Sequence, residues 1–251
     1  MKVAVAGKGG VGKTTVSAFL ARCWRDLGHE VVAVDADPDA NLAGTLGYRG
    51  PDLIPLVRMK PLIEERVGGG WGGFLRMNPR VDDIPRELGV VVEGIRVLVM
   101  GIIERGRRGC ACPENILLRE VLNHLMLRSR EHVVVDMEAG VEHLGRGTAE
   151  GVDKMLVVVE AGWASLETAA RVAKLAGDLG IRQVHAIANK ISGDADLEFV
   201  RANLAGPPLV GVLPLDRELE LEARAGSVSR ERPFYREMLR IAQQLGGEER
   251  P

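Results

Sequence analysis

The alternation of short valine-rich runs with longer amphipathic segments constrains this chain most strongly. Apolar runs, continuous rather than alternating, occupy 2–6, 30–35, 95–100, 132–136, 155–160, 184–189 and 209–214. Helical spacing of apolar residues is found between them at 13–27, 114–129, 165–179 and 196–205. Continuous apolar strands are typically buried on both faces. The order therefore predicts an α/β fold, with a mostly parallel twisted sheet and helices on both of its faces.

Chain length favours one domain. An α/β fold of 251 residues is commonly a single unit, so we expect residues 1–251 to form one domain. The stretch 44–94 is less regular and contains five prolines and the glycine cluster Gly68-Gly69-Gly70-Trp71-Gly72-Gly73. We interpret this stretch as an excursion from the sheet. Its glycine cluster is either a surface loop or a loop that closes over a ligand or partner.

Charge and composition argue against several classes of protein. The 33 basic and 35 acidic side chains give a net charge of −2, so nucleic-acid binding is not expected. No run reaches the roughly 18 apolar residues of a membrane span, and the first predicted strand starts almost at Met1. We therefore expect a cytoplasmic protein. Three cysteines are too few for a disulfide scaffold, so a cysteine pair suggests metal or redox chemistry first.

A phosphate-binding loop follows the first predicted strand. Gly7-Lys8-Gly9-Gly10-Val11-Gly12-Lys13-Thr14 matches the pattern G-x-x-x-x-G-K-[ST] and opens a predicted helix. Backbone N–H groups of such a loop point at phosphates, while Lys13 places a cation on the β- and γ-phosphates and Thr14 helps to hold Mg²⁺. The predicted nucleotide contacts in this region are Gly9, Gly10, Val11, Gly12, Lys13, Thr14 and Thr15.

Acidic residues follow two further strands. Asp35-Ala36-Asp37-Pro38-Asp39-Ala40-Asn41 brings several oxygens to the expected phosphate side. We assign Asp37 to the attacking water and Asn41 to the metal, with a solvated acidic turn as the alternative. Asp136 is predicted to bind the magnesium ion, unless it only caps its strand, and the N–H of Gly140 is predicted to reach the γ-phosphate.

The segment Asn189-Lys190-Ile191-Ser192 bears on the base. It begins like the guanine-reading pattern N-K-x-D, but Ser192 replaces the aspartate that would accept the guanine protons. The sequence therefore favours adenine, and hence ATP. Asn189 is predicted to read the base edge, with Lys190 beside it and Pro214 packing nearby.

A cysteine pair precedes the second long helix. Pro113 suits the first helical position, which places Cys112 at the N-cap, where the helix dipole favours a thiolate. Cys110 and Cys112 supply half of a tetrahedral site, and a symmetric dimer would complete a four-thiolate site for Zn²⁺ or Ni²⁺. An incidental pair and a redox pair are the alternatives. Cys23 lies within the first predicted helix and is expected in the core.

The loop with its second lysine, Lys8, resembles the signature loop of the deviant-Walker ATPases, which include the nitrogenase iron protein and the Min and Par ATPases. The resemblance implies a P-loop NTPase fold. It also implies a face-to-face homodimer in which Lys8 reaches the partner's nucleotide. Lys8, Lys13, Asp37 and Asp136 would then be the catalytic set.

Three further segments, 77–85, 109–115 and 136–147, resemble the ATPases that mature the nickel site of carbon monoxide dehydrogenase, and the similarity extends over most of the chain. That resemblance implies an ATP-driven metallochaperone that uses ATP and Mg²⁺, carries Ni²⁺ and acts on carbon monoxide dehydrogenase. Ala161-Gly162-Trp163 departs from the expected pattern, which has a proline-containing loop after Glu160.

Two other functions remain open at this point. An iron–sulfur reductase would need a cluster cysteine after Asp136, and 137–144 contains none. A Min- or Par-like spatial organiser would cycle on membrane or DNA. The last predicted helix carries an apolar stripe that fits either a membrane anchor or packing on the sheet: Phe234, Met238, Ile241 and Leu245. Packing is the simpler reading, so we expect no stable membrane association.

Overall fold

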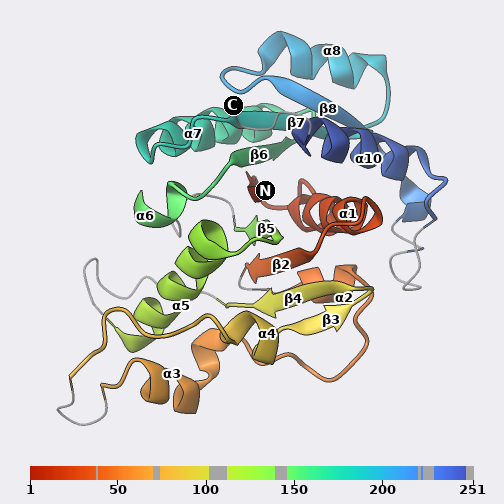
Figure 1. Cartoon of the computed structure of the whole chain (residues 1–251). Coiled ribbons are helices and arrows are strands. Elements are labelled where there is room, and N and C mark those ends of the chain that lie inside the picture. Colours follow the sequence, from red (N-terminus) through yellow and green to blue (C-terminus); the bar gives the residue numbers. More distant parts are fainter. Residues whose placement is uncertain are drawn as a thin grey trace.

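The computed structural model describes residues 1–37, 39–69, 74–101, 112–138, 146–219, 222 and 229–246. Its described strands form one eight-stranded sheet in the order β3-β4-β2-β5-β1-β6-β7-β8 (Figure 1). Every neighbouring pair is parallel except β3 and β4. The strands are β1 (Lys2–Gly7), β2 (Val31–Ala36), β3 (Val90–Val92), β4 (Ile95–Val99), β5 (His132–Met137), β6 (Lys154–Val159), β7 (Val184–Ile191) and β8 (Leu209–Pro214). The predicted sheet is confirmed.

Helices cover both faces of this sheet (Figure 1). The long helices are α1 (Lys13–Asp26), α5 (Pro113–Asn123), α7 (Trp163–Asp178), α8 (Asp194–Asn203) and α10 (Pro233–Gly246). The shorter ones are α2 (Leu42–Thr45), η1 (Leu56–Arg58), α3 (Lys60–Arg66), α4 (Ile84–Leu88) and α6 (Arg146–Ala149). A π-helical turn, η2 (His124–Arg128), continues α5 where the sequence predicts an unbroken α-helix to residue 129.

Two hydrophobic cores lie on opposite sides of the sheet, because successive side chains of a strand point to opposite faces. In β1, Val3 and Val5 pack with α1 and α10, whereas Ala4 and Ala6 belong to the core under α5 and α7. All four side chains are fully buried. This double burial is the physical reason for the continuous apolar runs.

The apolar stripe of α10 is core. Phe234, Met238, Ile241 and Leu245 are at most 3% exposed, and the helix packs against α1 and β8. Packing on the sheet, the simpler of the two explanations, is therefore confirmed. None of the helices in the described ranges is both long and apolar enough to span a bilayer.

The excursion between residues 44 and 94 holds more regular structure than the sequence suggests. It contains η1, α3, α4 and the edge strand β3. Pro61 and Pro85 stand in the first turns of α3 and α4, where a missing N–H costs nothing. In the sequence these prolines suggested loops, and elements of three to seven residues are too short to show a clear period.

Candidate functional site

Polar residues gather at the carboxyl edge of the sheet. The phosphate loop follows β1, Asp35 lies near the end of β2, Asp136 near the end of β5, and Asn189 near the end of β7. Asp35 and Asp136 are register partners on neighbouring strands. Ligands of open parallel sheets bind at this edge, so the described strands place the predicted site where the fold favours one.

The phosphate loop has a backbone that suits glycine. Gly10 and Gly12 have φ of 84° and 93°, and Gly12 is the N-cap of α1. A Cβ on Gly12 would lie 2.4 Å from Nδ2 of Asn189, so a side chain there would displace the Asn189 amide. The N–H of Val16 donates to the carbonyl of Gly12 at 3.0 Å and begins the helix.

The two lysines of the loop occupy different environments. Lys13 is 8% exposed, and its ammonium lies 3.5 Å from the carbonyl of Lys8. Lys8 is exposed. Thr14 and Thr15 lie half-buried at the start of α1. The loop therefore presents one internal and one external cation.

Asp136 fits a divalent cation. It is fully buried, its Oδ1 accepts a hydrogen bond from the Ser17 hydroxyl at 3.0 Å, and its Oδ2 has no hydrogen-bond partner in the described structure. Burial raises its pKa to about 6, against the lowering effect of the Thr14 and Ser17 hydroxyls. A buried carboxylate oxygen without a donor, beside a threonine hydroxyl, matches the oxygen donors that Mg²⁺ prefers.

The acidic segment after β2 is organised by Asp35. Its Oδ2 accepts the N–H of Leu42 at 2.8 Å and its Oδ1 accepts the N–H of Asp37 at 3.2 Å. Burial raises the pKa of Asp35 to about 7 despite these bonds, and the neighbouring Asp136 adds to the rise. Asp37 is half-buried and Asn41, the N-cap of α2, is exposed. Both predicted residues thus lie in the segment that follows the carboxyl end of β2.

Asn189 and Lys190 contact the phosphate loop. Nδ2 of Asn189 donates to the carbonyl of Val11 at 2.8 Å, and the Lys190 ammonium donates to the carbonyl of Gly10 at 2.6 Å. Lys190 has a φ of 59°, which is uncommon for a residue with a side chain. Pro214 pairs in register with Ile191 beside them. The sequence had indicated base recognition, and these loop contacts were not foreseen.

Cys112 is the N-cap of α5, as predicted, and is partly buried. Cys110 and Gly140 lie outside the described residues. Within the described ranges, no group of three or more His, Cys, Asp or Glu side chains could hold a metal ion. Cys23 is fully buried and burial raises the pKa of its thiol to about 12, so the prediction of a core cysteine is confirmed.

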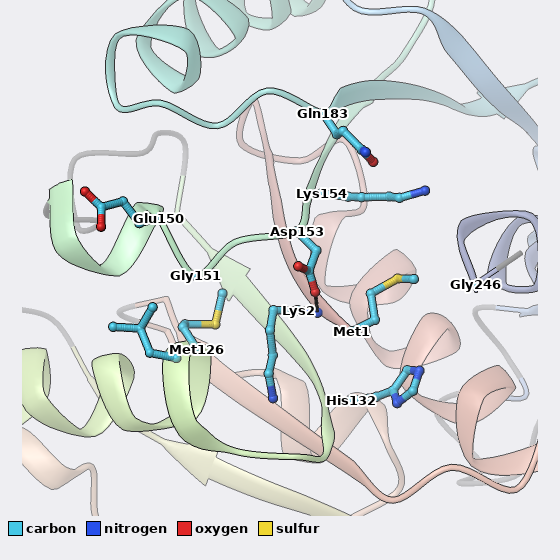
Figure 2. Close-up of a pocket in the computed structure, with 11 residues that line it drawn as sticks. Met1, Lys2, Met126, His132, Glu150, Gly151, Asp153, Lys154, Gln183 and Gly246 are labelled. Carbon is cyan, nitrogen blue, oxygen red and sulfur yellow. Dashed lines mark hydrogen bonds between the residues drawn. The ribbon is translucent and has the colours of Figure 1, made fainter. Parts of the chain in front are cut away.

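A cavity of about 500 Å³ opens at the opposite, amino edge of the sheet (Figure 2). Lys2, His132 and Lys154, the first residues of β1, β5 and β6, line it. Figure 2 shows the Lys2 and Lys154 side chains extending in different directions, and the Lys2 ammonium donates to the carbonyl of Glu131 at 2.6 Å. The basic groups do not converge on one point, so we assign no ligand to this cavity.

The sheet order, the glycine loop with its internal lysine and the magnesium-compatible aspartate define a P-loop nucleotide-binding protein. Residues 2–228 match the model of the CobQ/CobB/MinD/ParA nucleotide-binding domain. The chain belongs to this family, and the predicted deviant-Walker P-loop fold and ATPase class are thereby confirmed.

Comparison with curated relatives shows which members of this family the chain is similar to. The chain is 45% identical over 231 residues to the carbon monoxide dehydrogenase accessory protein CooC of Rhodospirillum rubrum, covering 90% of this chain and 88% of the relative. It is 43% identical to an ATP-binding protein of Methanocaldococcus jannaschii, with 87% of each covered. The predicted resemblance to the maturation ATPases of carbon monoxide dehydrogenase is confirmed.

Solved structures support the fold. The MinD of the MinC:MinD cell division complex of Aquifex aeolicus superposes with a TM-score of 0.71 at 20% identity, covering 100% of this chain and 97% of that chain. A ParA-family ATPase of Chlorobium tepidum gives 0.71 at 16% identity, with 96% and 97% covered. At these identities the likeness establishes the architecture alone.

Proposed function

We propose that this ATPase is a metallochaperone that acts in the cytoplasm as a homodimer, binds Ni²⁺ between its subunits and inserts it into carbon monoxide dehydrogenase. Zn²⁺ is a second ion that the same thiolates would accept. The similarity to CooC carries this proposal, because it extends over 90% of the chain at 45% identity. MinD relatives match at 24 to 25% identity, which favours the maturation function over a spatial organiser.

Each subunit, residues 1–251, would work as one ATPase domain that binds ATP on the phosphate loop. The α1 N-terminus and Lys13 neutralise phosphate charge, and the exposed Lys8 is free to reach the nucleotide of a facing subunit. Asp37 orients the attacking water. Thr14, Asn41 and Asp136 would hold Mg²⁺, which neutralises charge that develops on the phosphates when it is bound.

Contacts to the adenine base are expected at the carboxyl edge of the sheet. Asn189 and Lys190 already fix the loop through the carbonyls of Val11 and Gly10. We propose that the same segment, with Pro214, borders the adenine, and that the N–H of Gly140 reaches the γ-phosphate. Binding and hydrolysis then need positioning and charge stabilisation rather than covalent chemistry.

The metal would be held by Cys110 and Cys112 of both subunits. An N-cap thiol beside a helix dipole is readily ionised, and four thiolates match a closed tetrahedral site. Because one subunit supplies only two ligands, metal binding and dimer formation are expected to be linked. No nucleic acid and no stable membrane contact belong to this cycle.

The test is a Ni²⁺ titration in which the molecular mass is monitored, with and without ATP. It is carried out on the native protein and on the Cys110→Ser, Cys112→Ser double variant. We expect one Ni²⁺ per dimer in the native protein and none in the double variant, while ATP binding persists. Cys23→Ala, which removes a buried thiol, is the matched control and should keep the metal. Metal binding that survives in the double variant would contradict the proposed site and reopen the organiser function.

A further inference from the structure

The glycine-rich stretch after α3 is flanked by two segments that pair with each other. Gly68 and Leu75 form an antiparallel bridge. We refer to 67–69 and 74–76 as the paired segments, and residues 70–73 between them lie outside the described structure. The sequence left this stretch open as a surface loop or a loop that closes over a ligand or partner, and the surroundings of the paired segments bear on that choice.

The paired segments lie against the first turn of α5. A Cβ on Gly69 would lie 3.1 Å from Cγ of Pro113 and 2.7 Å from Cδ2 of Leu75. Pro113 is the first residue of α5, and the residue before it, Cys112, is the N-cap. Figure 1 shows α3 beside the same end of α5, and the two helices pack together. The paired segments therefore contact the residue next to a cysteine that is proposed to bind the metal.

Hydrogen bonding and burial fix the backbone of the paired segments. The N–H of Arg76 donates to the carbonyl of Val67 at 2.8 Å. Val67 is fully buried, and Leu75 packs against the core under α5. Phe74, the residue before Leu75, is by contrast 100% exposed. A large aromatic side chain is thus presented to solvent from an anchored backbone.

Phe74 is the most exposed large hydrophobic side chain of the described residues. Met77, three residues further on, is exposed as well. Aromatic side chains and methionine are enriched in protein interfaces, where aromatic anchors supply much of the binding energy. Phe74 and Met77 therefore offer apolar surface near the start of α5 that the described part of the chain does not cover.

A metal shared by two copies of this chain determines which molecule approaches that surface. Thiolate sulfur lies about 2.3 Å from Zn²⁺, so the two Cys112 sulfurs of a dimer that binds one ion would be less than about 5 Å apart. The surfaces around Cys112 must then face each other across the dimer axis. Because the paired segments touch the adjoining Pro113, we expect them at this contact. No comparable constraint fixes where the enzyme that accepts the nickel would bind.

We propose that the paired segments form a contact between the two subunits of the metal-loaded dimer, with Phe74 as its apolar anchor. The Phe74 ring is buried against the facing subunit when the cysteines share an ion. A twofold dimer uses the same patch on both subunits, so two copies of this contact form together. The proposal rests on the proposed function, since it needs one metal shared by two subunits.

The experiment measures the dissociation constant of the dimer by analytical ultracentrifugation of the full-length protein, with saturating Ni²⁺ and a non-hydrolysable ATP analogue. Phe74→Ala should weaken the metal-loaded dimer by at least about tenfold, because truncation of an interface anchor commonly costs that much. Phe74→Leu keeps most of the apolar area, so it should weaken the dimer less than Phe74→Ala does.

Leu127→Ala is the matched control. Leu127 is an apolar side chain that is 53% exposed, but it lies in η2, at the far end of the helical unit that Cys112 caps. The rise of a helix places it about 22 Å along the axis from Cys112. Removing this side chain should change the dissociation constant by less than about twofold, as for a surface substitution away from a contact.

Protein concentration supplies a second readout. Phe74 carries no metal-binding atom, so Phe74→Ala should again bind one Ni²⁺ per dimer once the protein concentration exceeds its raised dissociation constant. ATP binding by the separate subunits should remain native. Cys112→Ser removes a ligand, so its nickel binding should not recover at any concentration.

The outcomes separate the two proposals. A native protein that binds no Ni²⁺, or binds it without dimerising, would overturn the proposed function itself. A native protein that dimerises with Ni²⁺, together with a Phe74→Ala protein of native dissociation constant, would overturn the subunit contact alone. If that variant also delivered nickel to carbon monoxide dehydrogenase more slowly, Phe74 would belong to the surface that meets the acceptor enzyme instead.

Discussion

The two edges of the parallel sheet bury opposite charges. At the carboxyl edge, Asp35 and Asp136 are fully buried, and burial raises the pKa of both. At the amino edge, Lys2 and Lys154 are 7% and 3% exposed. The fold therefore buries carboxylates at one edge of the sheet and ammonium groups at the other.

The two edges differ in how completely these charges are satisfied. The Lys2 ammonium donates to a backbone carbonyl, and its main-chain N–H donates to Asp153 at 2.8 Å. At the other edge, Asp136 keeps one oxygen without a partner in the described structure, and left-handed backbone is found at Gly10, Gly12 and Lys190. An unpartnered buried carboxylate oxygen and left-handed backbone thus both occur where a ligand is expected.

The largest expected effect concerns Asp136, the incompletely hydrogen-bonded carboxylate of the carboxyl edge. Asp136→Asn should lower Mg²⁺-dependent ATP hydrolysis by at least about 100-fold, because it removes a charged metal ligand. It should also raise the Tm of the nucleotide-free protein by about 2–4 °C, the shift that about 1 kcal/mol produces in a chain of this size. Relief of a buried, poorly paired carboxylate is the reason.

Asp26, at the end of α1, is the matched control for that variant. Burial opposes its ionisation, but Tyr235 and Arg25 hold the pKa of Asp26 below its ordinary value. Asp26→Asn should therefore lower Tm and leave hydrolysis intact, the reverse of the result at Asp136. Thermal unfolding and a phosphate-release assay measure both. Loss of stability in Asp136→Asn would show that its carboxylate is structural.

A smaller effect is expected at Lys190. Lys190→Met removes the 2.6 Å bond to the carbonyl of Gly10 and should raise KM for ATP by about threefold to tenfold, since a hydrogen bond of this kind contributes about 1 kcal/mol. The change in kcat should be smaller. Lys174→Met, an exposed lysine of α7, is the control. An unchanged KM would mean that the loop keeps its shape without this contact.

The smallest effect concerns Lys2, at the amino edge. Burial lowers its pKa from 10.5 to about 8, although Glu131 and Asp153 act to raise it. The folded protein therefore binds fewer protons than the unfolded chain between pH 8 and 10.5, so stability from this group rises with pH across that window and is constant below it.

Lys2→Met should abolish that rise. Tm measured from pH 7 to 10.5 should show the native protein gaining a few degrees relative to the variant above pH 8, while ATP hydrolysis at pH 7 stays the same in both. A difference in Tm that is flat over the whole range would contradict a buried, destabilised ammonium. Lost hydrolysis would show that the amino edge reaches the site.

Local pattern predicted most of this fold. The seven apolar runs correspond to seven of the eight described strands within about two residues at each end, because burial on both faces leaves a continuous signal. Only β3 was missed. With three residues and an exposed Val91, it has neither the length nor the burial that marks the others. The phosphate loop could be predicted equally well, since its glycines are required by the local backbone conformation alone.

Contacts between segments that are far apart in the sequence could not be predicted from local pattern. Asn189 lies 178 residues from Val11 and donates to its carbonyl, and Asp35 was one of several acidic residues in a turn until the structure showed which N–H groups it holds. A motif fixes residue types at local spacing, but the partner of a buried polar group depends on which strands become neighbours.

The sequence by itself determined the class of fold, the loop that meets phosphate and the pair of thiols, since each depends on local periodicity, backbone geometry or the chemistry of adjacent residues. Only the tertiary structure decided that Asp35 and Asp136 become register partners on the neighbouring strands β2 and β5, and that β2 lies between β4 and β5. The physical reason is that strand order sets these distances, and strand order results from packing two cores around one sheet.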